Sequence, residues 1–253
     1  MQHIYGNQSR IFLNTALGCD ASCAYCYLPK LGIGGETGYI SANQAFKILK
    51  ELPYFEPGKD GTILSLGCYS ECWSEKNRIQ TLDLLEKLVE LGNPIQLATK
   101  KMISAEDIFK IDALSVWKNQ IGIYLSTPTL SSSEEIEPGT ASPDCRLLPL
   151  RYMKEIRSLY FVLYIKPVIG GITICDMAQY RNLMKLYPEL SVVVGAMLTM
   201  RHEKGNFAQV GEGKLQEKVV EDNDILAWEL GKERVVYRHS TDVVKAKVEL
   251  FEL

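Results

Sequence analysis

The stretch "RIFLNTALGCDASCAYCYLP" (residues 10–29) joins a short apolar run to three of the seven cysteines of the chain. Apolar and aromatic residues in 10–17 predict a β-strand. The cysteines follow this strand directly, with the spacing Cys19-x3-Cys23-x2-Cys26. Three cysteines within eight residues require a chemical explanation, and the composition of the chain limits which explanations apply.

The composition is typical of a soluble globular protein. The 253 residues are 46% apolar and 23% charged, which suits one large hydrophobic core. Lys and Arg total 28 against 31 Asp and Glu, so the net charge of −3 gives no general attraction to nucleic acid or to an anionic membrane. Neither an export signal nor a membrane-spanning stretch is recognisable. We therefore expect a cytoplasmic protein without a membrane partner, whose clustered cysteines bind a metal or catalyse a reaction.

Apolar, β-branched runs alternate with segments of helical periodicity along most of the chain. Six strands are expected, at 10–17, 61–67, 94–99, 120–126, 160–169 and 190–198. Five helices are expected between them, at 41–52, 78–92, 104–117, 144–157 and 176–187, with Ser41 and Ser104 as N-caps. This alternation predicts an α/β fold with a parallel sheet, arranged as a partial (β/α)6 TIM-type barrel.

A change in composition after residue 200 suggests a second part of the chain. Residues 1–200 are expected to form the barrel, and the polar, glycine-punctuated 201–253 a short C-terminal extension that packs on it. Within this extension, a helix is expected near 214–230 and a last strand near 234–239.

The cysteine loop follows the carboxyl end of the first expected strand, and α/β barrels build their active sites at that end. Three thiolates on one loop suit a 4Fe–4S cluster that is bound through three of its irons and keeps one iron open. A zinc site would need a further ligand, but the three histidines (His3, His202 and His239) are scattered without ligand spacing. Three unrelated buried thiols are the other alternative.

A Cys-x3-Cys-x2-Cys loop after the first strand of a βα barrel, with an aromatic residue before the last cysteine, resembles the radical S-adenosylmethionine (radical SAM) superfamily. The resemblance implies that the open iron binds the amino and carboxylate groups of SAM. One electron from the cluster then cleaves SAM to methionine and a 5′-deoxyadenosyl radical, which abstracts a hydrogen atom from the substrate. An electron donor such as flavodoxin or ferredoxin is implied as a partner.

Finer motifs resemble the spore photoproduct lyase-like branch of that superfamily. In chain order they read "GCDASCAYCYLP", "LATKK", "YLSTPT", "EEIEPGTASPDCRL" and "IKPVIGG". By this resemblance Tyr25 lies near the adenine of SAM and Ser70 contacts its amino group. Lys100 and Ser126, by the same resemblance, hold its carboxylate. The alternatives are a solvated lysine at the end of a strand and ordinary turn serines.

The same resemblance implies two catalytic residues. Cys68, in "GCYSE" after the second expected strand, matches the position of the hydrogen-donor cysteine of the lyase. Tyr27 matches a tyrosine that is proposed to relay hydrogen with this cysteine. An inert buried thiol is the alternative for Cys68. For Tyr27 the alternative is a ring that shields the cluster from solvent.

Two features depart from the resemblance. The Gly-Gly-Glu that is usual in radical SAM proteins is absent at the second strand, and basic residues in the C-terminal part are interleaved with acidic ones instead of forming an arginine-rich surface for DNA. The sequence therefore predicts a radical SAM enzyme with an unassigned substrate, for which a nucleic acid or nucleotide is one class. A spore photoproduct lyase-type DNA repair lyase is one alternative. A non-catalytic iron–sulfur protein for binding or redox sensing is the other.

Overall fold

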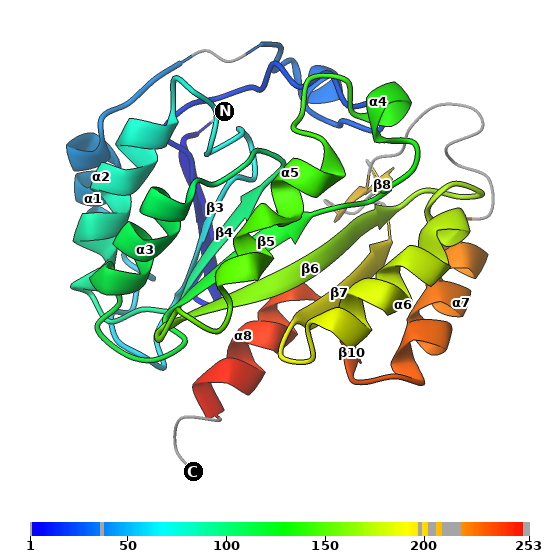
Figure 1. Cartoon of the computed structure of the whole chain (residues 1–253). Coiled ribbons are helices and arrows are strands. Elements are labelled where there is room, and N and C mark those ends of the chain that lie inside the picture. Colours follow the sequence, from blue (N-terminus) through cyan, green and yellow to red (C-terminus); the bar gives the residue numbers. More distant parts are fainter. Residues whose placement is uncertain (1, 36–37, 197–198, 202–205, 209–218, 250–253) are drawn as a thin grey trace.

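The computed structural model describes residues 2–35, 38–196, 199–201, 206–208 and 219–249 (Figure 1). An eight-stranded sheet lies at its centre, in the order β1-β2-β3-β4-β5-β6-β7-β10. β1 pairs antiparallel with β2, and all other neighbours in this sheet are parallel. The strands of the sheet are β1 (Ile4–Asn7), β2 (Arg10–Leu13), β3 (Ile63–Leu66), β4 (Ile95–Thr99), β5 (Ile121–Ser126), β6 (Leu159–Val168), β7 (Ser191–Ala196) and β10 (Val236–Tyr237). A separate two-stranded sheet comprises β8 (Thr199–Arg201) and β9 (Asn206–Ala208).

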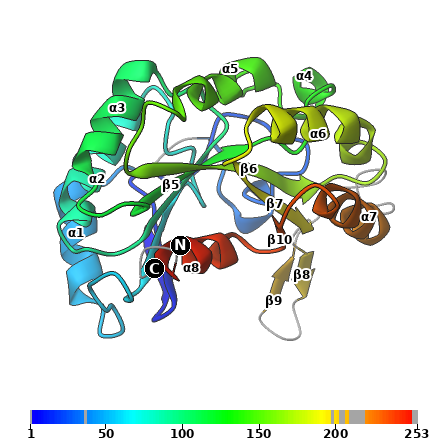
Figure 2. The same cartoon turned by 60° about the horizontal axis from the view of Figure 1, so that its bottom comes forward.

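Helices follow most of the parallel strands. Five of them (α1, α2, α3, α5 and α6) cover one face of the sheet, and α8 lies against the opposite face (Figure 2). The helices are α1 (Ala42–Glu51), α2 (Arg78–Val89), α3 (Ala105–Leu114), α4 (Ser133–Ile136), α5 (Pro143–Leu147), α6 (Met177–Leu186), α7 (Val219–Gly231) and α8 (Ser240–Glu249), with 3₁₀ turns at Pro29–Leu31, Leu148–Tyr152 and Thr173–Asp176. Within the described part of the chain, no helix has the length and apolarity needed to cross a bilayer.

Side-chain caps determine where two of these helices begin. The backbone N–H of Gln44 donates a hydrogen bond to the Ser41 hydroxyl (3.2 Å) at the start of α1. The backbone N–H of Asp107 donates to the Ser104 hydroxyl (3.1 Å) at the start of α3. Both bonds satisfy amide groups that have no partner within the helix. They confirm the two N-caps predicted from the sequence.

Both faces of the sheet are buried, which explains the continuous apolar runs of its strands. Leu64 and Leu66 of β3 belong to the main core, which lies on the face covered by the helices. Tyr124 and Tyr160 lie on the opposite face, where Val243 of α8 packs in the same apolar cluster. α8 therefore takes the place of solvent on the second face of the sheet.

The structure confirms an α/β fold with a mostly parallel sheet. The sheet is not closed and has β1 and β10 at its edges, and the partial TIM-type barrel remains a prediction. The sequence pattern does not predict β1, because its four residues "IYGN" are short and partly polar. The helix predicted at 144–157 is too long. α5 ends at Leu147, and a 3₁₀ turn follows, because Pro149 has no N–H group for an α-helical hydrogen bond.

The C-terminal part contains one predicted strand and one helix that is not predicted. β10 confirms the strand expected near 234–239 and pairs with β7. α7 lies within the helix expected near 214–230, of which 214–218 fall outside the described residues. α8 is not predicted. The division into 1–200 and 201–253 remains a prediction about domains, and β10 lies at the edge of the same sheet as β2 to β7.

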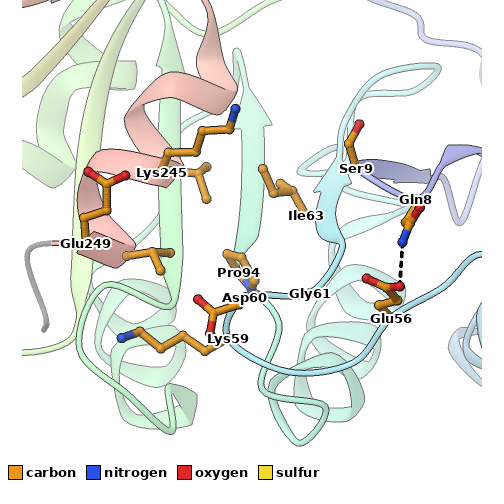
Figure 3. Close-up of a pocket in the computed structure, with 12 residues that line it drawn as sticks. Gln8, Ser9, Glu56, Lys59, Asp60, Gly61, Ile63, Pro94, Lys245 and Glu249 are labelled. Atoms are coloured by element: carbon orange, nitrogen blue, oxygen red, sulfur yellow. Dashed lines mark hydrogen bonds between the residues drawn. The ribbon is translucent and has the colours of Figure 1, made fainter.

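A cavity of about 470 Å³ lies at the amino ends of β2, β3 and β4 (Figure 3). Ser9, Ile63 and Pro94 line it at the starts of these strands, and Lys245 and Glu249 line it from α8. In parallel α/β sheets the active site lies at the carboxyl ends of the strands. This cavity is therefore at the opposite end of the sheet from the predicted site.

Candidate functional site

The cysteine loop lies at the carboxyl ends of the parallel strands. The backbone N–H of Gly18 donates a hydrogen bond to the carbonyl of Tyr69 (2.8 Å), just after β3. On its other side, the N–H of Ala24 donates to the carbonyl of Ile136 (2.9 Å), so the loop also lies beside α4 (Figure 1). Gly18 has a φ of +89°, and a Cβ there would lie 1.5 Å from the carbonyl oxygen of Gly35. Only glycine therefore fits at position 18, directly before Cys19.

The three cysteine side chains are partly buried and free of disulfides. Burial raises the pKa of the Cys19 thiol to about 11 and also raises the pKa of Cys23, while the positive charge of Lys100 opposes the shift at both. A nearby cation of this kind favours the thiolate, which is the form that binds metal. Cys26 lies one turn further, with its N–H bonded to the carbonyl of Cys23 (2.9 Å).

Three cysteine thiols on one loop are a donor set that can hold a 4Fe–4S cluster. Across the described ranges, no three His, Cys, Asp or Glu side chains are grouped so that they could hold one metal ion. Structural zinc gathers its four ligands around one point, whereas cysteines that hold a 4Fe–4S cluster each bind a different iron. Three separate soft thiols on one loop, beside the charge of Lys100, suit the second arrangement. Cys19, Cys23 and Cys26 are the residues that could hold it.

A buried ion pair fixes the tyrosine that precedes the last cysteine. The Tyr25 hydroxyl donates a hydrogen bond to the Glu137 carboxylate, whose other oxygen accepts one from Arg146 Nη1 (2.6 Å). Neither charged side chain of this pair is exposed at all. Arg146 also donates to the carbonyls of Ser126 (2.9 Å) and Ala141 (2.6 Å). The segment after α4 is thereby joined to the cysteine loop and to the end of β5.

Lys100 follows β4 and faces the same place. Its Nζ lies 5.7 Å from the centre of the Tyr25 ring, and its carbonyl accepts a hydrogen bond from the N–H of Ala141 (3.0 Å). Burial lowers the pKa of Lys100, but the negative charges of Cys23, Glu137 and Glu71 together raise it above the ordinary value. The ammonium group therefore stays charged at neutral pH and can bind an anionic group.

Ser70 carries an unsatisfied polar atom beside the cysteine loop. Its residue pairs with Gly18 in an isolated parallel bridge. The Oγ of Ser70 is buried and has no hydrogen-bond partner among the described residues. A buried hydroxyl without a partner costs about 1–3 kcal/mol, and such an atom is expected where a ligand supplies the partner. Ser70, Lys100 and Ser126 lie after or at the carboxyl ends of β3, β4 and β5, and Tyr25 lies on the cysteine loop beside Lys100. Their contacts with SAM remain predictions.

Cys68 and Tyr27 are also brought together. The Tyr27 hydroxyl donates to the carbonyl oxygen of Cys68 (2.9 Å) and lies 3.4 Å from its Sγ. A second tyrosine, Tyr5 of β1, donates to the Cys68 sulfur at 2.9 Å and stacks on Tyr69, with ring centres 4.4 Å apart. Burial, followed by the charge of Cys68, raises the pKa values of Tyr5 and Tyr27. Both hydroxyls therefore keep their protons and act as donors to Cys68.

Four residues of this site are not predicted from the sequence. Tyr5 is not predicted because the sequence pattern does not indicate β1. Glu137 and Arg146 lie in the quoted segment "EEIEPGTASPDCRL", but an acid and a base nine residues apart give no sign of pairing until the segment folds back. Glu71, the fourth residue, is buried and accepts hydrogen bonds from the N–H groups of Trp73 (3.0 Å) and Lys100 (2.9 Å) and from the Thr99 hydroxyl. Its carboxylate is therefore engaged with the protein itself.

The chain is similar in fold to solved radical SAM enzymes. No protein-family model and no curated protein matches the sequence. SuiB of Streptococcus suis bound to S-adenosylmethionine has a TM-score of 0.60 and 15% identity, covering 90% of this chain and 49% of SuiB. SuiB bound to its precursor peptide SuiA has a TM-score of 0.59 with 15% identity, covering 90% and 48%. Methylornithine synthase (PylB) has a TM-score of 0.51 with 16% identity, covering 89% of this chain and 63% of PylB.

SuiB and PylB are radical SAM enzymes. The similarity defines the class of fold, an α/β structure with a mostly parallel sheet like that of radical SAM enzymes. This chain spans about half the length of SuiB and less than two thirds of PylB. At these identities the comparison shows the fold, and the chemistry must be argued from the site.

Removing one charge of the buried pair should destabilise the protein strongly. Glu137→Gln keeps the size of the side chain but leaves Arg146 buried without its counter-charge. We expect the free energy of unfolding to fall by about 3–5 kcal/mol, measured by equilibrium urea denaturation. Glu135→Gln, at an exposed position of α4, is the matched control and should change it by about 0.5 kcal/mol or less. Equal stability of the two variants would show that the pair does not hold this region together.

Proposed function

We propose that this protein is a radical SAM enzyme. The observation that carries the proposal is the three-cysteine loop, held at the carboxyl ends of a parallel sheet of this fold, beside a charged lysine and an unpartnered buried hydroxyl. When bound, a 4Fe–4S cluster would supply the electron that cleaves SAM to a 5′-deoxyadenosyl radical for hydrogen abstraction. The open sheet would correspond to the partial TIM-type barrel of this class.

The chain's own residues would bind and orient the two cofactors. The ammonium of Lys100 and the hydroxyl of Ser126 would hold the SAM carboxylate, and the free Oγ of Ser70 would accept a hydrogen bond from its amino group. The Tyr25 ring, fixed by Glu137, would pack near the adenine. These roles rest on the sequence resemblance, and the positions of Ser70, Lys100 and Tyr25 around one region support them. Cys19, Cys23 and Cys26 would hold the cluster.

A finer part of the proposal follows the spore photoproduct lyase-like branch. Cys68 would donate a hydrogen atom from its thiol to a substrate radical, and the resulting thiyl radical would take a hydrogen atom from the Tyr27 hydroxyl. The Tyr27 radical would then take a hydrogen atom back from 5′-deoxyadenosine, which regenerates the deoxyadenosyl radical. The 3.4 Å between the Tyr27 hydroxyl and the Cys68 sulfur supports this pairing. Tyr5, at 2.9 Å from the same sulfur, is a second group that can hold the thiol in place.

The substrate stays unassigned, and a nucleic acid or nucleotide is one class to test. An electron donor such as flavodoxin or ferredoxin would reduce the cluster. A DNA repair lyase would bind duplex DNA with an affinity that falls steeply as salt rises. A non-catalytic iron–sulfur protein would have no use for SAM, so titration with SAM separates it from the enzyme.

The cluster itself gives the first test of this function. Protein purified and reconstituted without oxygen should be brown and carry about four irons per chain, measured by iron and sulfide analysis. Replacing Cys19, Cys23 and Cys26 together by alanine should remove the iron, since each thiolate binds one iron. Cys175→Ala, at an exposed cysteine, should retain it. Iron kept by the triple variant, or stoichiometric zinc in the wild type, would refute the cluster.

SAM binding tests the positions of Lys100 and Ser126. In the reconstituted protein Lys100→Ala and Ser126→Ala should each weaken SAM binding roughly ten- to a hundredfold, because each loses a hydrogen bond to a charged carboxylate. Isothermal titration measures the affinity, and 5′-deoxyadenosine released with dithionite measures cleavage. Lys154→Ala and Ser131→Ala, both exposed, are the matched controls. Unchanged affinity in both site variants would mean that SAM binds elsewhere.

The role of Cys68 is tested by how SAM is used. Cys68→Ala should keep the cluster, SAM affinity and uncoupled cleavage, because the side chain is not a ligand of either cofactor. With a substrate found by screening for 5′-deoxyadenosine formation, the variant should give no product or an altered one, and it should use more SAM per turnover. Chromatography of the product and of 5′-deoxyadenosine measures both. Wild-type product and SAM use would show that Cys68 only packs.

A further inference from the structure

On the face of the sheet that carries α8, this helix covers the half that lies toward the amino ends of the strands. The start of α8 is fixed at mid-height, since the carbonyl of Ser240 accepts hydrogen bonds from Gln96 Nε2 (2.9 Å) and from the Tyr124 hydroxyl (2.9 Å). From there α8 runs across this face (Figure 2) toward the amino ends of the strands, where its last turns line the cavity of Figure 3. The start of α8 therefore lies midway along this face of the sheet, between its amino and carboxyl ends.

Arg10, a cation whose hydrogen-bond partners are neutral, lies beside the start of α8. Arg10 of β2 donates from Nε to the Ser65 hydroxyl (2.7 Å) and from Nη1 to the Ser240 hydroxyl (3.2 Å). Its guanidinium also lies 4.5 Å from the centre of the Phe12 ring. Among the described residues Arg10 has no acidic partner within ion-pair distance, so its charge is not compensated and several of its N–H donors remain available.

Lys166 of β6 is a second cation that approaches the same place, from the side of the sheet opposite to β2. The side chain of Lys166, on β6, lies across Gly195, where a Cβ would come within 2.8 Å of Lys166 Cδ. Tyr237 of β10 pairs with Val193 of β7 in parallel. His239 and Gly195 each come two residues later along the chain, so they lie at the same level of the sheet. Lys166 therefore reaches toward His239, and no acid pairs with it in the described part of the chain.

The charges around His239 are mostly positive. Burial lowers the pKa of His239, and Lys166, Arg10 and Lys245 lower it further, whereas Asp242 is the acid that opposes them. His239 itself is bonded through Nδ1 to the hydroxyl of Thr241 (2.6 Å). With three cations against one acid among these groups, the local charge is positive and attracts anions.

We propose that Arg10, Lys166 and His239 form a binding site for an anionic group, a phosphate or a carboxylate, of the substrate. Arg10 would donate to the anion from the N–H groups that the two serines leave free, and Lys166 would add a point charge. The carboxylate of SAM does not explain these cations, because it is assigned to Lys100 and Ser126 at the ends of β4 and β5. This inference rests on the proposed function in taking the bound molecule to be the substrate, and it narrows that substrate to anionic compounds.

The test follows the imidazole resonance of His239 by NMR, in the reconstituted protein with the oxidised cluster. Inorganic phosphate and succinate are titrated separately, His239→Gln assigns the resonance, and His3 serves as internal reference. We expect a saturable shift of the His239 resonance with at least one anion, and the more effective anion identifies the chemistry. Lys166→Gln and Arg10→Gln should weaken binding roughly tenfold. Lys185→Gln, an exposed lysine of α6 with the same change of charge, should not.

Two results would overturn the site: no saturable shift with either anion, or equal binding in Lys166→Gln, Lys185→Gln and the wild type. The side chain of Lys166 makes no hydrogen bond to another described residue, so its variant should fold even if Arg10→Gln does not. Iron content and SAM affinity, measured on the same variants, should be unchanged. A wild-type protein that binds neither iron nor SAM would refute the proposed function. The anion titration does not depend on SAM cleavage, so it can fail while the proposed function holds.

Discussion

The candidate site depends on one buried ion pair. Glu137 and Arg146 are both fully buried, and either charge alone in the interior would be strongly destabilising. They are tolerated because their remaining polar atoms are used. The carboxylate accepts from Tyr25, and the guanidinium donates to backbone carbonyls of Ser126 and Ala141. These bonds require the segment after α4 to fold over the cysteine loop. The loop is thereby positioned by electrostatics as much as by the sheet.

The sheet supplies the second constraint. Parallel strands bring residues that are far apart in sequence to one edge, so the ends of β3, β4 and β5 present Ser70, Lys100 and Ser126 beside the cysteines. α8 fills the amino half of the face below them. The unpartnered hydroxyl of Ser70 lies beside the cysteine loop. The guanidinium of Arg10 lies beside the start of α8, bonded to the hydroxyls of Ser65 and Ser240.

The sequence was sufficient for features that depend on local pattern. Alternating apolar and helical segments predicted the parallel sheet, and the caps at Ser41 and Ser104 were readable because a cap lies within a few residues of its partner. The spacing of the cysteines and their place after a strand predicted the loop. What failed was either short, as with β1, or interrupted, as with the helix that stops before Pro149.

Long-range side-chain contacts were beyond the sequence for a different reason. Tyr5 and Cys68 are 63 residues apart and meet only because β1 pairs with β2 at the sheet edge. Arg10 and Ser240 are 230 residues apart and meet only through α8, which was not predicted. In each case the partner's element had first to be placed in the fold. Motif resemblance could nominate Lys100, Ser126 and Ser70 singly, and the structure added that they lie after or at the carboxyl ends of neighbouring strands.

The central claim is that SAM binds to an open iron of a cluster held by the cysteine loop. Electron paramagnetic resonance of the dithionite-reduced, reconstituted protein tests it most directly, because SAM bound to the open iron changes the electronic environment of the cluster. We predict a 4Fe–4S signal in the protein alone and a clear change of its g-values on addition of SAM, smaller in Lys100→Ala at the same SAM concentration. A cluster signal that stays the same at saturating SAM would contradict the account.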